Sequence, residues 1–173
     1  MADPGLTRRF VAQHERPAGA AALDFAALSP YHRCLLVTDG TVTSLLEAYA
    51  LEAVRTRCLD RAAGRLTPVQ QRWLRADARA ATLARRVVIE GVRSNAAYLS
   101  ASSVLIPDRL PPDFVAALAH EHASIGSALI GAAVEHRREL LWFDRPAGTV
   151  ASRTYRVFIQ GRPALLITEE FLR

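Results

Sequence analysis

The stretch RTYRVFIQGRPALLITEEFL, residues 153–172, decides the fold of this chain. Its two halves are rich in apolar, β-branched and aromatic residues, and Gly161-Arg162 between them marks a turn, so the stretch predicts a β-hairpin. Upstream, ARRVVIEGVRSNAAYLSASSVLIP (residues 84–107) predicts a second hairpin with its turn at residues 91–95. Strands therefore cluster in pairs and do not alternate singly with helices. We expect an α+β fold built on an antiparallel sheet.

The rest of the chain supplies one more strand and several helices. LEAVRTRCL alternates in polarity and predicts a strand over residues 51–59. Ser44 followed by Glu47 fits a capping box, so a helix is expected from Ser44, and Thr67-Pro68 predicts the start of another. Further helices are expected in residues 20–40, 112–119 and 125–138. We expect residues 1–18 to form a loose lead-in and residues 19–173 to form a single domain.

Composition narrows the class of partner. All 22 basic residues are Arg, and they are scattered in spite of a net charge of +5, so we expect no nucleic-acid partner. The chain shows neither an apolar run of the roughly 20 residues that a membrane span needs nor a secretory signal, so we expect no membrane partner and a cytoplasmic protein. Composition says nothing about the oligomeric state.

Four charges on the predicted strands are candidates for chemistry. Successive side chains of a strand point to opposite faces, so Glu169 lies on an apolar face and Glu170 on a mixed one. By the same parity Arg85 shares its face with apolar residues, and Arg86 does not. Two readings follow for Arg85 and Glu169: a buried ion pair that satisfies itself, or a polar pocket, which we favour.

Three other motifs carry no site. His120 and His122 flank Glu121 without a third ligand at a suitable spacing, so we expect no metal. GTVTSLLEA has a single glycine and lacks the Gly-Lys-Ser/Thr of a phosphate-binding loop. The serines of residues 100–103 lack the glycine elbow of a nucleophile and a matching His–Asp pair.

Five motifs in order resemble a known family. They are LLVTDGTVTSLLE, RRVVIEG, IPDRLPP, SIGSAL and the closing RTYRVFIQGRPALLITEEFL, spread over residues 30–173. Together they resemble the chorismate pyruvate-lyase family, and in particular its actinobacterial branch, which makes 4-hydroxybenzoate. The Gly-x-Pro of the last motif, followed by an apolar strand and TEEFL, is the most specific part.

The resemblance implies a fold, an activity and a site. It implies an antiparallel sheet whose helices and loops cover a closed pocket, and a lyase that splits chorismate into 4-hydroxybenzoate and pyruvate without a cofactor or a metal. The family's essential arginine and glutamate fall on Arg85 and Glu169. Two apolar positions that line its pocket for the aromatic ring fall on Val42 and Ile125.

The chemistry of chorismate agrees with these residue types. Arginine is well shaped to bind one of its two carboxylates through parallel hydrogen bonds. A protonated Glu169 can protonate the departing ether oxygen, whereas an ionised Glu169 can accept the ring proton, and the sequence leaves both roles open.

Two alternatives to this lyase remain. One is an effector-sensing domain of the same fold, which would need a winged-helix region that the residues before 30 are too few to form. The other is a lyase that acts on an amino-substituted chorismate, which contacts to one exocyclic group would decide.

Overall fold

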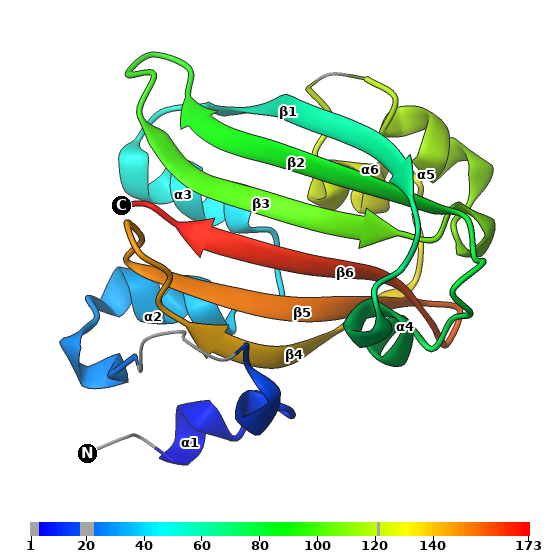
Figure 1. Cartoon of the computed structure of the whole chain (residues 1–173). Coiled ribbons are helices and arrows are strands. Elements are labelled where there is room, and N and C mark those ends of the chain that lie inside the picture. The colour runs from blue at the N-terminus through cyan, green and yellow to red at the C-terminus, as the bar shows by residue number, and fades with distance from the viewer. Residues whose placement is uncertain (1–3, 18–22, 121) are drawn as a thin grey trace.

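One six-stranded antiparallel sheet forms the centre of the molecule (Figure 1). The computed structural model describes residues 4–17, 23–120 and 122–173. The strands are β1 (Val54–Gly64), β2 (Thr82–Gly91), β3 (Ala97–Leu105), β4 (His136–Asp144), β5 (Ala151–Ile159) and β6 (Arg162–Phe171). Their order is β1-β2-β3-β6-β5-β4, and every neighbouring pair is antiparallel. The α+β class expected from the sequence is confirmed.

The closing hairpin occupies the interior of this sheet. After β3 the chain crosses to the far edge of the sheet, where it forms β4. Strands β5 and β6 then lie between β4 and β3. The β5–β6 hairpin turns at Gln160-Gly161, both with positive φ, one residue earlier than we expected. β6 therefore has a partner on each side, β3 and β5.

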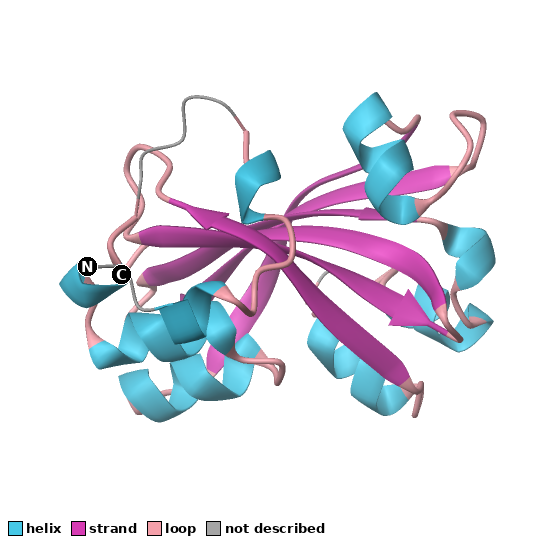
Figure 2. Cartoon of the chain, turned by 90° about the horizontal axis from the view of Figure 1, so that it is seen from below, coloured by secondary structure: helices cyan, strands magenta, loops and turns pink. Residues whose placement is uncertain are grey.

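Helices cover the sheet unequally. The elements are α1 (Pro4–Thr7), η1 (Gln13–Glu15), η2 (Phe25–Ala27), α2 (Pro30–Val37), α3 (Val42–Ala50), α4 (Pro68–Leu74), η3 (Pro107–Arg109), α5 (Pro112–Ala117) and α6 (Ile125–Gly131). Helices α2 and α3 pack at one end of a face that we call the inner face, and α5 and α6 pack at its other end (Figure 2). α4 packs on the opposite, outer face against β6.

Each helix group has its own hydrophobic core. Leu36 of α2 and Leu46 of α3 are fully buried, and they belong to one cluster with Phe171 of β6. Phe114 of α5 and Leu129 of α6 belong to a second cluster with residues of β3, β5 and β6. The two cores leave the middle of the inner face between them.

The structure corrects three further expectations. Helix α3 begins at Val42, because Thr41 and not Ser44 precedes its first turn. The helix expected over residues 125–138 ends at Gly131, where the chain turns through Ala133 with a φ of 47° and then enters β4. The capping box at Thr67 and the strand that follows Leu51 are confirmed.

The third correction concerns the N-terminal segment. Phe10 and Ala12 are buried, and the N–H groups of Val11 and Ala12 donate to the carbonyls of Leu140 and Leu141 on β4. This part of the expected lead-in is packed on the domain and is not loose. Within the described ranges, no helix is long and apolar enough to cross a membrane.

Candidate active site

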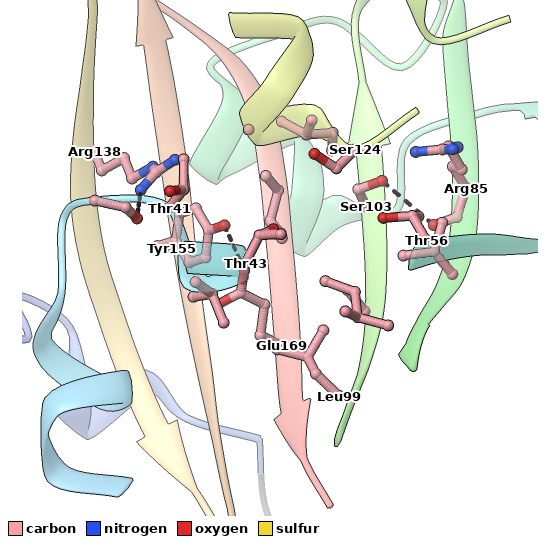
Figure 3. Close-up of a pocket in the computed structure, with 18 residues that line it drawn as sticks. Thr41, Thr43, Thr56, Arg85, Leu99, Ser103, Ser124, Arg138, Tyr155 and Glu169 are labelled. Atoms are coloured by element: carbon pink, nitrogen blue, oxygen red, sulfur yellow. Dashed lines mark hydrogen bonds between the residues drawn. The ribbon is translucent and has the colours of Figure 1, made fainter. Parts of the chain in front are cut away.

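A pocket lies on the inner face, between the two helix groups (Figure 3). Strands β1 to β6 supply its floor, and the first residues of α3 and α6 supply part of its wall. The space that no atom fills measures about 640 Å³, including the open mouth. Arg85, Glu169, Val42 and Ile125, the four residues singled out from the sequence, all line it.

Arg85 reaches the pocket from β2. Its side chain is buried, whereas Arg86 on the next position is exposed, as strand parity predicted. Nη2 of Arg85 donates to the carbonyl of Ala123 over 2.6 Å, and its buried Nε has no hydrogen-bond partner within the described residues. A buried donor without a partner is unfavourable, so this guanidinium retains capacity for a ligand.

Glu169 lies on β6, two strands away from Arg85. Its carboxylate is held on both oxygens: Oε2 accepts from Nε of Arg153 over 2.7 Å, and Oε1 accepts from the hydroxyl of Tyr155 over 2.9 Å. Burial, and then the negative charge of Glu169, raise the pKa of Tyr155, so the phenol keeps its proton and donates it. Glu170, one residue further, does not line the pocket.

Arg153 is the partner that sequence reasoning missed. It is completely buried, and besides Glu169 its Nη1 donates to the carbonyls of Leu36 and Thr38 at the end of α2. Its ion pair with Glu169 means that the alternative of an Arg85–Glu169 pair is wrong. Nothing local distinguishes this arginine from others, because the β5–β6 register creates the pairing.

Val42 and Ile125 stand at the first position of α3 and of α6. Ser124 caps α6, and it forms a reciprocal capping box with Ser127. The first residues of both helices therefore line the pocket.

Arg138 enters the pocket from the edge strand β4. Its Nη1 donates to the carbonyls of Asp39 and Gly40 in the loop that precedes α3. Like Arg85 it has a buried Nε without a partner in the described part of the chain. Sequence reasoning placed Arg138 on a helix and did not consider it for the site.

The two histidines lie outside the pocket, whereas one of the serines of residues 100–103 lies in it. His120 and His122 are exposed and do not line the pocket, and among the described residues no three His, Cys, Asp or Glu side chains are grouped to hold a metal. Ser103 does line the pocket, with its hydroxyl donating to the carbonyl of Arg85 over 3.3 Å.

The pocket thus combines an apolar interior with one carboxylate and two incompletely paired arginines (Figure 3). Ile89, Leu99 and Ile167 supply apolar surface in the lining. Such a lining suits a ligand that combines apolar surface with negative charge.

Comparison with known proteins agrees with this description. The family described as "Chorismate pyruvate-lyase Rv2949c-like" matches residues 36–173. A protein named chorismate pyruvate-lyase from Mycobacterium tuberculosis is 26% identical over 160 residues, which cover 82% of this chain and 79% of that protein. The protein of the same name from Mycobacterium leprae is 26% identical, with 82% and 73% covered.

Among solved structures, the fold is similar to an effector domain. The effector domain of PhnF from Mycobacterium smegmatis matches with a TM-score of 0.58 and 11% identity, over 78% of this chain and 90% of that chain. A transcriptional regulator of the GntR family from Bacillus cereus matches with a TM-score of 0.53 and 10% identity, over 69% and 91%. At such identities the likeness concerns the fold alone.

Proposed function

The chain belongs to the chorismate pyruvate-lyase Rv2949c-like family, and from this membership we propose that it eliminates pyruvate from chorismate to give 4-hydroxybenzoate. One observation carries the proposal: Arg85 and Glu169 line the same pocket from separate strands, with an apolar space between them. An anion-binding group and a proton-transferring group are what this elimination needs.

Arg85 binds the carboxylate on the ring. Its Nε is buried and unpaired within the described residues, and Nη2 is anchored on Ala123, so the guanidinium is held in one orientation before the substrate arrives. A carboxylate that accepts from it gains a charge-assisted hydrogen bond in a site that is largely shielded from water. The ring then extends from β2 toward β6.

Glu169 accepts the proton from C4, the ring carbon opposite that carboxylate. Both of its oxygens already accept hydrogen bonds, one from Nε of Arg153 and one from the hydroxyl of Tyr155. A base role is therefore better supported than the acid role that the sequence left open. Tyr155 fixes the direction of the carboxylate.

The electron balance needs no external reagent. As the C4–H bond breaks, its electron pair completes the aromatic ring, and the C3–O bond breaks with its pair passing to the oxygen of the enolpyruvyl group. The departing enolate of pyruvate takes up one proton on its methylene carbon and becomes pyruvate. Because aromatisation drives the reaction, positioning and electrostatic stabilisation supply the catalysis, and we propose that neither a metal nor a cofactor takes part.

Incubation of the purified protein with chorismate tests the proposal. We expect pyruvate and 4-hydroxybenzoate in equal amounts, and we expect the same rate after dialysis against a chelator. Chorismate that is bound but returned unchanged would indicate an effector-sensing domain. Turnover of an amino-substituted chorismate in place of chorismate would move the substrate assignment to that compound.

A further inference from the structure

We propose that Arg138 binds the second carboxylate of the substrate, the one on the enolpyruvyl side chain. Arg85 and Arg138 would then hold a dianion at its two ends, with Glu169 between them. The inference rests on the proposed function and names a further substrate-binding residue for it.

The placement of Arg138 follows from the strand order. β6, which carries Glu169, has β3 and β2 on one side and β5 and β4 on the other. Arg85 on β2 and Arg138 on β4 therefore lie two strands from Glu169 in opposite directions, and Figure 3 shows them at the two ends of the pocket. The guanidinium carbon of Arg138 lies 5.8 Å from the centre of the Tyr155 ring, whose hydroxyl donates to Glu169.

The hydrogen bonds of Arg138 leave one side of its guanidinium available. Nη1 is fixed on the carbonyls of Asp39 and Gly40, whereas the buried Nε has no partner among the residues described. A carboxylate that accepts from Nε and from the adjacent terminal nitrogen in two parallel bonds satisfies that buried donor. The anchored Nη1 also lowers the entropy that is lost when the ligand binds.

The charges of the pocket point to a ligand with two negative groups. Its charged lining residues are Arg85, Arg138 and Glu169. Glu169 is already compensated by Arg153, which lies behind it. Two positive charges therefore remain without a carboxylate partner in the described part of the pocket, and a dicarboxylate neutralises both.

The position of the reacting bond decides which arginine binds which carboxylate. The ring carboxylate is opposite C4, so a substrate whose C4 faces Glu169 directs that carboxylate away, toward Arg85. The enolpyruvyl group is attached to C3, next to C4, and is therefore on the Glu169 side, where Arg138 lies beside Tyr155. When the C3–O bond breaks, the negative charge that develops on the departing enolate is close to Arg138.

The inference is tested by measuring the binding of two stable ligands, one with a single carboxylate and the other with two carboxylates. The probes are 4-hydroxybenzoate and 3-(1-carboxyvinyloxy)benzoate, an aromatic dicarboxylate that cannot eliminate, and titration calorimetry measures their Kd. We expect Arg138→Gln to weaken binding of the dicarboxylate roughly 10- to 100-fold, as for a lost charge-assisted hydrogen bond. Its affinity for 4-hydroxybenzoate should equal that of the wild type.

Arg137→Gln is the matched control, because Arg137 is exposed on the opposite face of the same strand and should leave both affinities unchanged. Equal dicarboxylate affinity in the wild type and Arg138→Gln would overturn the inference. So would parallel losses for both ligands, or a wild type that binds neither. Turnover plays no part in this measurement, so a wild type that binds both probes but yields no 4-hydroxybenzoate from chorismate would refute the proposed function alone.

Discussion

Strand β5 carries two buried arginines that each hold a glutamate, one on each face of the sheet. On the inner face, Nε of Arg153 lies 2.7 Å from Oε2 of Glu169. On the outer face, Nε of Arg156 lies 2.6 Å from Oε2 of Glu139 on β4. Arg153 is 0% exposed and Arg156 is 7% exposed, so the two arginines are similarly buried and similarly close to their glutamates.

Their surroundings differ. Around the outer pair the space is filled: Nη1 of Arg156 donates to the carbonyl of Trp73 at 2.9 Å, and its guanidinium stacks near the rings of Trp73 and Phe158. The inner pair instead borders the pocket that Arg85 and Arg138 also line. A buried ion pair is therefore not by itself a sign of function, whereas unfilled space beside one is.

The largest effect should come from exchanging the two glutamates for glutamine. We expect Glu169→Gln to lower kcat for chorismate by roughly 10²- to 10⁴-fold, because glutamine keeps the size of the side chain but cannot accept the proton. Glu139→Gln and Glu170→Gln should keep ordinary turnover. Steady-state kinetics with thermal melts checks this, and equal activity in the folded Glu169 and Glu139 variants would remove the distinction between the pairs.

The next effect concerns Arg85, one of the two pocket arginines that hold no glutamate. Arg85→Ala should reduce kcat/KM roughly a hundredfold, the loss expected when an oriented charge contact of about 3 kcal/mol is removed. Arg86 is exposed on the other face of β2, so Arg86→Ala should leave kcat/KM unchanged. Similar kinetics for the two variants would mean that β2 presents its charges differently from the structure.

Breaking the outer pair should lower the stability of the protein. Arg156→Ala leaves Glu139 without this arginine and removes the hydrogen bond to Trp73, so we expect a loss of about 3 kcal/mol in the free energy of unfolding. Urea unfolding measures it, and turnover per folded molecule should stay ordinary. The double variant Arg156→Met with Glu139→Leu should regain much of the stability, and a folded double variant without activity would assign the outer pair a part in function.

The contribution of a third carboxylate, that of Glu52, to stability should depend on pH. Glu52 accepts from the hydroxyl and N–H of Ser94, the hydroxyl of Tyr98 and the N–H of Arg93, and these bonds lower its pKa from 4.5 to about 2. Its stabilising effect is therefore full above pH 4.5 and is lost as the pH falls toward 2. Glu52→Gln should flatten the fall of the melting temperature in this pH window. An equally steep fall in the variant and the wild type would contradict the assignment.

The local pattern of polar and apolar residues was sufficient to predict part of the site. The alternation of β2 and β6 correctly placed Arg85 and Glu169 on one face, because side-chain direction in a strand depends only on parity. Strand β4 was missed, since the helix before it ends at Gly131 and Ala133, two residues later, has a left-handed conformation that is normally signalled by glycine. Its exposed first residues, His136 and Arg137, also resemble the polar end of a helix.

The contacts of the site required the whole fold. Arg153 meets Glu169 through the register of β5 on β6, and Arg138 reaches the pocket because β4 crosses to the far edge of the sheet. Neither of these two contacts can be predicted from the periodicity of the sequence. Val42 and Ile125 came from the family resemblance and not from local pattern, and the structure brings both to the pocket at the starts of α3 and α6.

A crystal structure with 4-hydroxybenzoate tests most directly the claim that the inner pair borders the active site and the outer pair does not. We predict the ligand in the inner pocket, with its carboxylate on Arg85 and its hydroxyl directed toward Glu169. Arg156 and Glu139 should remain packed under Trp73 without a ligand. An inner pocket that stays empty at saturating ligand, or a ligand whose carboxylate lies away from Arg85, would contradict the account.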